Sequence, residues 1–322
     1  MADFYRTIHV GLGSIGRAIA ELAARRRDIV PVAAADLAPD LAGRDLYEVV
    51  GVDGPAPVPI VGDAAAALAT PADVALYATG SFLEDVAPQL LQAVRAGRNV
   101  ISTCEELAYP WRRRPDLAAE LDREARRAGV TVLGTGINPG FVLDTLALCL
   151  SGVCGQVRRI EAVRVVDVSR RREQLQRKVG VGLSLEEFQR RAAAGRFGHV
   201  GLPESAYLVA QGLGWELDEL RETIEPVPGE DGTARGARQV VTACVAGREV
   251  VRLSVEMAMG AAESRDELRI EGDPPVHVII DGGVPGDIAT AAVVVNCIPA
   301  VVAHEPGLVT MLDLPAPRSV GV

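Results

Sequence analysis

The sequence predicts an α/β fold, with a doubly wound domain followed by a second α+β domain that contains a mainly antiparallel sheet. Three observations lead to this prediction. Short apolar runs alternate with helical patterns over about the first 136 residues. A glycine-rich segment joins the first apolar run to the first helix, and long β stretches replace the alternation after Asp144. Alternating strands and helices are typical of a parallel sheet that is covered by helices.

Apolar runs in the first part of the chain are predicted to be strands. They are Ile8–Val10, Ile29–Ala35, Val74–Ala78, Val100–Ser102 and Val130–Leu133. Helical patterns lie between them, including Leu83–Ala96 and Asp116–Ala128, and Gly97 and Gly129 follow these two where C-caps are expected. The segment Leu37–Pro59 is rich in Pro, Gly and Asp, so it is predicted to be irregular.

The glycine-rich segment predicts a dinucleotide site after the first strand. It reads Val10-Gly11-Leu12-Gly13-Ser14-Ile15-Gly16. In such a site Gly11 permits a tight turn, Gly13 lets the backbone approach a pyrophosphate, and Gly16 lets helix and strand pack closely. The alternative is a glycine-rich connection in another α/β fold, because such turns are common.

The residues around this segment strengthen the prediction. Ser14 and Ile15 begin a helix whose N-terminal N–H groups and positive dipole suit phosphates. The second strand ends on Asp36, twenty residues after Gly16, where a carboxylate can accept hydrogen bonds from a ribose diol. We therefore expect a nicotinamide or flavin nucleotide. Asp36 would repel a 2′-phosphate, but the nearby Arg44 could compensate, so NAD and NADP both stay open.

Three more segments follow strands and should lie at the carboxyl ends, where open α/β sheets bind ligands. They are Ala78-Thr79-Gly80-Ser81, Ser102-Thr103-Cys104-Glu105-Glu106 and Gly134-Thr135-Gly136-Ile137-Asn138-Pro139-Gly140. We expect cofactor contacts from Thr79, Gly80, Thr103 and the turn Asn138-Pro139-Gly140. This last segment leads into the second domain and suits close approach to a cofactor, a hinge or an ordinary interdomain turn.

Glu105 and Glu106 are the charges best placed for chemistry. A carboxylate at the end of a central strand, beside a nicotinamide, suits proton transfer. The alternative is that the pair caps the next helix or points to solvent. Cys104 lies next to them, but the sequence shows no paired base, so we expect a small buried residue rather than a nucleophile.

Several other polar residues have more than one interpretation. Arg170-Arg171-Arg172, with Arg177 and Lys178, could bind a carboxylate or a phosphate, although a solvated charge run is favoured. His199 either lines a pocket or is a structural loop residue. Asn296 lies in an apolar helix and needs a partner, for which backbone or water is favoured over ligand.

The second domain is predicted from the loss of alternation. A helix is expected over Phe141–Leu150, and Ser184 begins a short helix with a capping box. Val240–Val245 and Val250–Met259 flank a turn as an antiparallel hairpin. We expect a nucleotide domain over residues 1–140, a substrate and dimerisation domain over 141–285, and a C-terminal helix and tail over 286–322.

The C-terminal helix is expected to be capped by Asp287, to run from Ile288 to about Cys297, and to pack back on the first domain. The apolar run from Ile288 to Ala303 is interrupted by polar residues and Pro299, so it is expected to be too short to cross a bilayer.

Composition excludes several classes of partner. The chain has 322 residues, 48% hydrophobic residues and a net charge of −10, which argues against nucleic acid and anionic membranes. Its N-terminal residues lack the pattern of a secretory signal. Five scattered cysteines and four scattered histidines lack metal-ligand spacing, so no metal is expected. Reduced thiols indicate a cytoplasmic protein.

Three segments together resemble the 2,4-diaminopentanoate dehydrogenase family. They are Asn99-Val100-Ile101-Ser102-Thr103-Cys104-Glu105-Glu106, Gly134-Thr135-Gly136-Ile137-Asn138-Pro139-Gly140-Phe141 and Asn296-Cys297-Ile298-Pro299. The resemblance extends through Lys178–Phe188 and His199–Ser205 and spans nearly the whole chain. This family includes the native amine dehydrogenases. It implies a dihydrodipicolinate reductase-like fold and a homodimer.

The resemblance also implies an activity and its residues. The family carries out NAD(P)-dependent oxidative deamination of an amine to a ketone or aldehyde plus ammonia, and the reverse reductive amination. Its essential glutamate lies in the segment that matches Ser102–Glu106, and we assign it to Glu105. Separately from the resemblance, Phe141, Val142 and residues of the 164–180 stretch are expected to line the substrate pocket. The His-His and Lys motif of a true dihydrodipicolinate reductase is missing from the sequence, so that activity is not expected.

Two other functions stay open on the sequence alone. One is a related oxidoreductase that acts on an alcohol or aldehyde, like homoserine dehydrogenase. The other is a non-catalytic nucleotide-binding sensor. Ammonia dependence of NAD(P)H oxidation distinguishes the first from an amine dehydrogenase, and steady turnover excludes the second.

Overall fold

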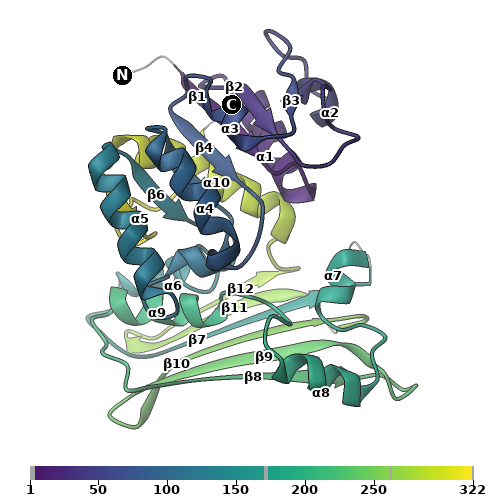
Figure 1. The fold of residues 1–322 in the computed structure, drawn as a ribbon. Coiled ribbons are helices and arrows are strands. Elements are labelled where there is room, and N and C mark those ends of the chain that lie inside the picture. The colour runs from purple at the N-terminus through teal and green to yellow at the C-terminus, as the bar shows by residue number, and fades with distance from the viewer. Residues whose placement is uncertain (1–3, 170–172, 262, 321–322) are drawn as a thin grey trace. The chain divides into compact units, whose positions relative to one another are not determined.

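The computed structural model describes residues 4–169, 173–261 and 263–320, so the run Arg170-Arg171-Arg172 lies outside the described residues. The chain divides into two compact units (Figure 1). Unit 1 comprises Met1–Gly140 and Pro285–Val322, and unit 2 comprises Phe141–Val284. Each unit has its own sheet.

Unit 1 is built on a seven-stranded sheet in the order β13-β6-β5-β4-β1-β2-β3, with neighbouring strands parallel. The strands are β1 (Tyr5–Val10), β2 (Ile29–Ala35), β3 (Ile60–Val61), β4 (Val74–Tyr77), β5 (Asn99–Ser102), β6 (Thr131–Gly134) and β13 (Gly307–Val309). The order runs in opposite directions from β1, so β1 and β4 form the switch point at which open α/β sheets bind ligands. The predicted α/β class is confirmed.

The helices of unit 1 pack in two groups. They are α1 (Ser14–Arg25), α2 (Leu46–Val50), α3 (Ala64–Leu68), α4 (Leu83–Arg95), the 3-10 helix η1 (Glu105–Ala108), α5 (Pro115–Ala128) and α10 (Gly286–Ala303). α1 packs against α10, and α4 packs against α5. Gly97 and Gly129, which follow α4 and α5, have φ of 73° and 71°, as the C-cap prediction requires.

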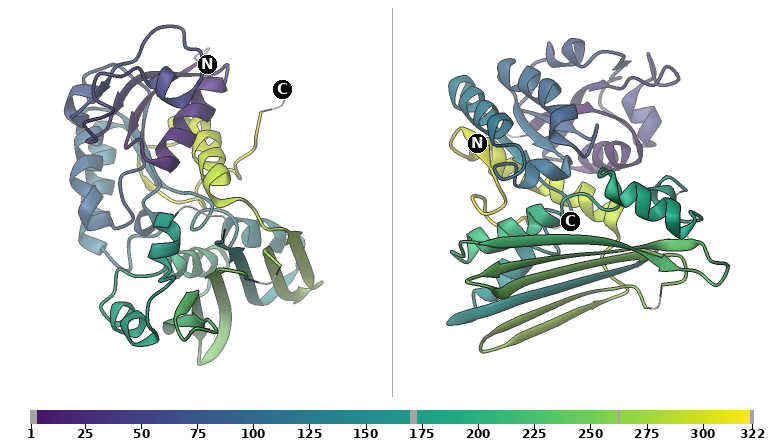
Figure 2. Two further views of the ribbon diagram at one scale, coloured as in Figure 1. Left: turned by 90° about the vertical axis from the view of Figure 1, so that its right-hand side faces the viewer. Right: turned by 60° about the horizontal axis from the view of Figure 1, so that its bottom comes forward.

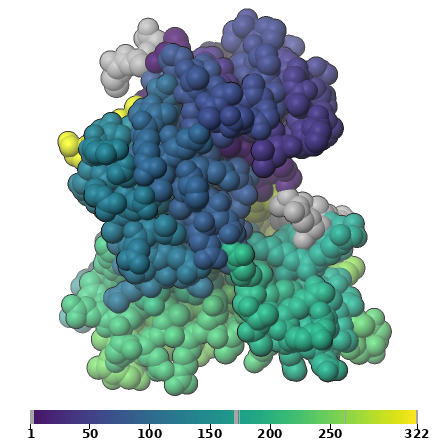
Figure 3. All heavy atoms as spheres, viewed as in Figure 1, coloured from purple at the N-terminus to yellow at the C-terminus, as the bar shows by residue number. Residues whose placement is uncertain are grey.

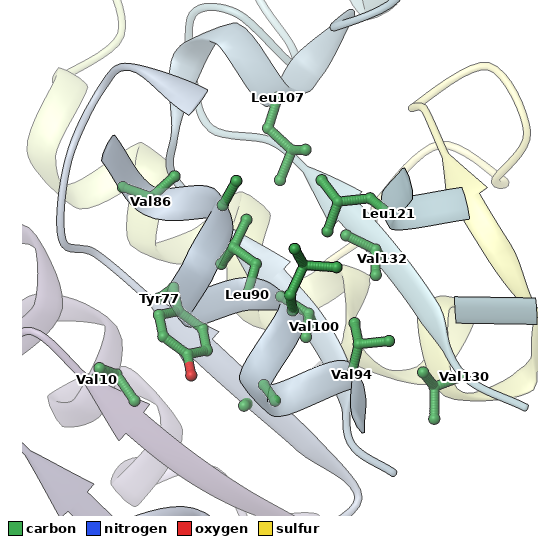
Figure 4. Packing of buried hydrophobic residues seen from close by; sticks show 14 of the residues in the cluster. Val10, Tyr77, Val86, Leu90, Val94, Val100, Leu107, Leu121, Val130 and Val132 are labelled. Carbon is green, nitrogen blue, oxygen red and sulfur yellow. The ribbon is translucent and has the colours of Figure 1, made fainter. Parts of the chain in front are cut away.

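The core of unit 1 comes from the apolar stripe of α4 and the strands beneath it. Leu90 and Val94 of α4 meet Val100 of β5 and Val132 of β6, with Leu121 of α5 beside them (Figure 4). All five are fully buried. Burying a Val or Leu side chain stabilises the fold by roughly 1.5–3 kcal/mol, so this stripe fixes the helix on the sheet.

The segment Leu37–Pro59 is mostly irregular, as predicted, but it contains the short helix α2 and a bridge between Asp45 and Pro59, and it forms part of the surface of unit 1 (Figure 3, upper right). The prediction for the last helix was wrong. The last helix runs over Gly286–Ala303 rather than from Ile288 to about Cys297, and Pro285 rather than Asp287 occupies the N-cap. Its buried residues pack against α1, which keeps it helical past Pro299.

α10 is also longer than the expectation that this segment is too short to cross a bilayer. By length and composition alone, this 18-residue helix is long and apolar enough to cross a bilayer. The same composition is found in core helices of globular proteins, and α10 contacts β4, β5 and β6 as well as α1.

Unit 2 is built on a six-stranded sheet in the order β12-β11-β7-β10-β9-β8. The strands are β7 (Gln156–Asp167), β8 (Glu219–Pro228), β9 (Ala234–Val245), β10 (Arg248–Ala258), β11 (Arg265–Asp273) and β12 (Val276–Asp281). The sheet is mainly antiparallel, as predicted, but β7 and β10 pair in parallel. The predicted hairpin is present, with Ala246 and Gly247 both at positive φ, as a tight two-residue turn requires.

Helices of unit 2 pack on one face of this sheet, the inner face (Figure 2, right). They are α6 (Thr145–Ser151), α7 (Glu173–Lys178), α8 (Leu185–Ala193) and α9 (Leu202–Gly212). Ser184 caps α8 by accepting the Glu187 N–H, as predicted. α6 begins four residues later than Phe141, because Asp144 is its N-cap and accepts the Thr145 N–H at 2.6 Å.

A buried ion pair holds the segment that leaves unit 2. Arg164 on β7 and Asp266 on β11 lie 3.1 Å apart, and their side chains are 4% and 2% exposed. Arg164 donates to the Val284 carbonyl, and the Val284 N–H donates to Asp266 at 2.7 Å. Both backbone groups of Val284 are therefore bound by the pair.

Charged networks occupy the other face of the sheet, which we call the outer face. Arg159 pairs with Glu161, Glu249 and Glu271. Glu267 pairs with Arg265, Arg269 and His277, and these contacts lower the pKa of Glu267 to about 2, the Arg269 hydrogen bond contributing most.

Candidate functional site

Four of the predicted segments meet along one edge of the unit 1 sheet. The residue after each strand donates its backbone N–H to the neighbouring strand, as Gly11 does to Ala35, Ala78 to Val10, Thr103 to Tyr77 and Thr135 to Ser102. The glycine-rich segment and the ends of β4, β5 and β6 therefore lie side by side at the carboxyl edge. This edge contains the switch point between β1 and β4.

The three glycines of the first segment have different structural reasons. Gly11 has φ of 83°, and a Cβ there would lie 2.7 Å from the Ala78 carbonyl oxygen. A Cβ at Gly16 would lie 1.8 Å from the Gly11 carbonyl oxygen. A Cβ at Gly13 has no atom of the described residues within 4 Å. Internal packing therefore requires Gly11 and Gly16, whereas Gly13 borders open space, as close approach of a pyrophosphate needs.

The N-terminus of α1 suits an anion. Gly13 is its N-cap, and the first turn is Ser14-Ile15-Gly16-Arg17, whose side chains are neutral or positive. Arg17 donates from Nε to the Leu12 carbonyl at 2.8 Å, which places a guanidinium beside the glycine-rich segment. Sequence reasoning missed Arg17, although its place one residue after Gly16 is a signal that could have found it. The segment thus fits a dinucleotide phosphate group.

Asp36 lies where the sequence predicted it, against the glycine-rich segment. One carboxylate oxygen accepts the Leu12 N–H at 2.5 Å, and the other accepts the Ala38 N–H at 2.7 Å. The carboxylate is therefore fixed in direction, and its other lone pairs can accept from a diol. Arg44 pairs with Glu48 at 3.3 Å, and both side chains are exposed.

The ends of β4 and β5 bring contrasting side chains to this edge. Thr79 and Gly80 are exposed, and Thr103 is half-buried. Glu105 and Glu106 begin η1, but Glu105 is half-buried whereas Glu106 is only 1% exposed. Glu106 accepts the Leu83 N–H, the first of α4, at 2.8 Å. The alternative that the pair caps a helix is therefore correct for Glu106, with α4 rather than the next helix as its partner.

The segment after β6 is folded tightly on itself. Residues 131–140 are all buried, and a Cβ at Gly140 would lie 2.5 Å from Thr135 Oγ1. The Ile137 N–H donates to Thr290 Oγ1 on α10 at 3.3 Å, a contact that sequence reasoning missed. Asn138 and Pro139 lie inside this buried turn. The turn is thus positioned by α10 as well as by β6.

Candidate residues of unit 2 lie on two separate segments. Phe141 is half-buried and Val142 is buried just before α6. The His199 backbone is held by Gln239, which accepts from its N–H at 2.9 Å and donates to its carbonyl at 2.7 Å. Burial and the charges of Lys178 and Arg164 lower the pKa of His199 to about 3, so this imidazole is neutral near pH 7.

The remaining polar candidates are structural. Asn296 accepts from Arg26, the C-cap residue of α1, at 3.1 Å, so its partner is a side chain, which sequence reasoning did not anticipate. Cys104 is buried, and burial raises its thiol pKa, as expected of an inert residue. Arg177 pairs with Glu173 on an exposed turn of α7. Within the described ranges, no group of three His, Cys, Asp or Glu is arranged for a metal ion.

Comparisons with known proteins agree with this architecture. The family model of the 2,4-diaminopentanoate dehydrogenase C-terminal domain matches residues 141–321. The chain is 31% identical to 2,4-diaminopentanoate dehydrogenase from Acetoanaerobium sticklandii over 334 residues, which covers 98% of this chain and 94% of that protein. It is 25% identical to an amine dehydrogenase from Streptomyces virginiae, with 98% and 97% covered.

Solved structures extend the likeness to three dimensions. An amine dehydrogenase from Mycobacterium smegmatis superposes with a TM-score of 0.86 at 25% identity, covering 98% of this chain and 97% of that one. A probable dehydrogenase from Thermotoga maritima, with a TM-score of 0.61 at 15% identity over 96% and 92%, shares the fold. Because both the family model and a relative over nearly the whole length match, this chain belongs to the 2,4-diaminopentanoate dehydrogenase family.

Proposed function

We propose that this chain is an NAD(P)-dependent amine dehydrogenase in which Glu105 is the catalytic acid–base. It converts an amine to a ketone or aldehyde plus ammonia, and it runs the reverse reductive amination. The names of its relatives support the activity. The single observation that supports the residue is the contrast within η1, because Glu106 is buried as a helix cap while Glu105 stands at the end of a central strand.

The carboxyl edge of unit 1 is the proposed cofactor site. The bound nicotinamide supplies the hydride acceptor or donor. Gly13 and the first N–H groups of α1 hold the pyrophosphate, and Asp36 accepts from the ribose diol. The other proposed contacts are Gly11, Ser14, Ile15, Gly16, Thr79, Gly80, Thr103, Asn138, Pro139 and Gly140.

We also propose that NAD is accepted at this site. Asp36 is held by two backbone N–H groups, so it cannot turn away from a 2′-phosphate without losing both. Arg44, which could balance that phosphate, pairs with Glu48 in the structure.

Glu105 performs the proton transfers. An ammonium group has no lone pair to drive hydride loss, so the Glu105 carboxylate first accepts one of its protons and passes it to solvent. The neutral amine then loses hydride from its carbon, and the iminium that forms is stabilised by the ionised carboxylate. Glu105 next takes a proton from the water that attacks the iminium carbon. Return of that proton to nitrogen makes ammonia the leaving group, and the Glu105 carboxylate accepts the hydroxyl proton as the C–N bond breaks and the ketone or aldehyde forms. Phe141 and Val142 are proposed to line the substrate pocket.

The test is the Glu105→Gln variant, which keeps the shape and removes the base. With a ketone, ammonium and NAD(P)H, its kcat should fall by about a hundredfold to ten-thousandfold, the range for general acid–base catalysis. NAD(P)H binding by fluorescence should change little. Glu120→Gln on α5, which pairs with Arg95 on α4, is the matched control and should retain activity. Normal turnover by Glu105→Gln, or NAD(P)H oxidation without ammonium, contradicts the proposal.

A homodimer through the outer face of unit 2 is part of the proposal. Ile279, which is 54% exposed, lies on that face opposite Glu267 of β11. Val163 of β7 and Val240 of β9 lie in the same row across the sheet, where they alternate with Glu267 of β11 and Ser254 of β10. A second copy would cover these three apolar side chains, and the networks would supply its polar rim. Light scattering should give a dimer mass that Ile279→Glu converts to monomer.

Free thiols support a cytoplasmic location.

A further inference from the structure

The two adjacent glutamates of η1 differ in what holds them. Glu105 is half-buried, and Glu106 is almost completely removed from water. We propose that Glu106 is a positioning residue, whose buried carboxylate fixes η1 and thereby aims Glu105 at the reacting nitrogen. This inference rests on the proposed role of Glu105.

Glu106 ties η1 to the segment between β4 and α4. Its backbone N–H donates to the Ser81 carbonyl at 3.3 Å, and its Oε2 accepts the Leu83 N–H at 2.8 Å. Phe82, the N-cap of α4, supplies no side-chain hydrogen bond, so the carboxylate of Glu106 takes that part from 23 residues away. The start of η1 and the start of α4 are therefore fixed together.

Two arginines lie near the buried carboxylate of Glu106, and Arg114 also pairs with Glu84 at 3.0 Å. Arg113 Nε lies 3.6 Å from Oε1 of Glu106, and Arg114 Nε lies 3.9 Å from Oε2. An isolated carboxylate with 1% exposure would be very costly, because burial removes its hydration. These contacts tie η1 to the residues before α5 as well. Glu106 thus joins three segments of unit 1, which are η1, the start of α4 and the residues before α5.

The backbone of η1 also rests directly on β6. A Cβ at Gly134, the last residue of β6, would lie 2.4 Å from the Leu107 carbonyl carbon and 2.7 Å from the Ala108 nitrogen. No side chain fits between β6 and η1 at this point. Because Glu106 is bound to the start of α4 and the backbone of η1 packs against Gly134, η1 has little freedom, and the backbone position of Glu105 is fixed with it.

Different substitutions at Glu106 separate its two contributions. Glu106→Gln keeps an oxygen for the Leu83 N–H but removes the charge that balances the arginines. Glu106→Ala removes both. If Glu106 acts through Glu105, either variant lowers kcat, and alanine has the larger effect. We expect about tenfold to a hundredfold for alanine, because misplacing a catalytic group by about 1 Å costs that much.

A double-mutant cycle tests the inference. Glu106→Ala should lower kcat in the native background but change it less than about twofold in the Glu105→Gln background, because only a misplaced Glu105 is then affected. A merely structural role lowers the rate by the same factor in both backgrounds, and that result overturns the inference, as does an unchanged kcat in the native background. If Glu105→Gln itself retains activity, the proposed function fails instead.

Two further measurements keep the test decisive. Hydrogen exchange at the Leu83 amide should become faster in Glu106→Ala, and unchanged exchange contradicts the capping role. If Glu106→Ala does not fold, Arg113→Gln leaves the cap in place and removes one balancing charge. Its kcat should fall a few-fold in the native background only, and an equal fall in the Glu105→Gln background overturns the inference.

Discussion

Acidic residues at the strand ends of unit 1 and on the outer sheet face of unit 2 have different partners. In unit 1, Asp36 and Glu106 each accept backbone N–H groups from a neighbouring segment, so they fix the loops at the carboxyl edge. In unit 2, acids such as Glu249 and Glu267 pair with arginines across the face of a sheet. The role of a carboxylate therefore depends on its position. At a strand end it fixes the loops of the candidate site, whereas on a sheet face it pairs with the arginines of the surface.

The largest effect on stability should come from the buried Arg164–Asp266 pair of unit 2, which binds the backbone of Val284. Removing Asp266 leaves the Arg164 charge buried and the Val284 N–H without its acceptor. Asp266→Ala should therefore lower the free energy of unfolding by about 3–5 kcal/mol in urea titrations. Burial raises the pKa of the Asp266 carboxyl, although the Arg164 charge and the Val284 N–H oppose this shift.

A double variant sharpens this prediction. Arg164→Met combined with Asp266→Leu removes both charges and should recover part of the loss. Recovery is incomplete because Val284 then lacks both partners. A loss below about 1 kcal/mol for Asp266→Ala would mean that the pair does not hold the segment.

The next effect concerns coenzyme choice in unit 1. Asp36→Ala removes the diol acceptor, and a hydrogen bond to a charged group contributes about 1.5–3 kcal/mol. We expect KM for NAD to rise by roughly tenfold to a hundredfold, and KM for NADP to change less because repulsion of the 2′-phosphate is relieved. Asp40→Ala, an exposed acid in the same loop, is the control. A greater loss with NADP than with NAD would refute the role of Asp36.

A smaller effect is expected from a buried base in the unit 1 sheet. Burial lowers the pKa of His9 from 6.5 to about 3, and its Nε2 lies 2.8 Å from Thr7 Oγ1. Below pH 6.5 His9 binds a proton in the unfolded chain but not in the folded chain. The contribution of neutral His9 to the free energy of unfolding is therefore fully present above pH 6.5 and is lost as the pH falls toward 3. His9→Gln should flatten this fall by about 1.4 kcal/mol per pH unit.

Urea unfolding at several pH values between 6 and 4 measures that slope. His277→Gln is the matched control on the outer face, where the side chain is exposed. If both variants show the native slope, His9 is not the group that titrates.

The smallest effect is expected from an exposed pair in unit 2. Arg177 and Glu173 are 75% and 74% exposed, one helical turn apart on α7. Glu173→Gln should change the free energy of unfolding by less than about 0.5 kcal/mol. If Glu173→Gln lowers the free energy of unfolding as much as Asp266→Ala does, then burial is not what makes the Arg164–Asp266 pair important.

The sequence predicted best where structure depends on local turn chemistry. The strand Ile29–Ala35 has the predicted bounds, and the glycines after α4 and α5 have the predicted positive φ. The parallel pairing of Ile160 with Val251 could not be predicted, because the two strands are far apart in sequence and no local pattern records their contact.

Tertiary packing limited the prediction of the candidate site. Glu105 and Glu106 are the same residue type in adjacent positions, and Glu106 is distinguished by contacts with other segments, such as the Leu83 N–H and the Arg113 side chain. In the same way, the start of α6 moved because Asp144 caps it, and Pro299 did not end α10 because the helix packs on α1. Arg17 shows that a local signal can also be overlooked.

Unit 1 is discontinuous in the chain, and this has a consequence for its synthesis. α10 and β13, which cover α1 and pair with β6, follow all of unit 2 in sequence. On the ribosome, β6 is therefore an unpaired edge for on the order of ten seconds or more while unit 2 is made. All residues of unit 2 are synthesised before β13 can join the sheet of unit 1. A chain whose synthesis stops between unit 2 and β13 would expose the free edge of β6, and chaperones and other chains bind to such edges.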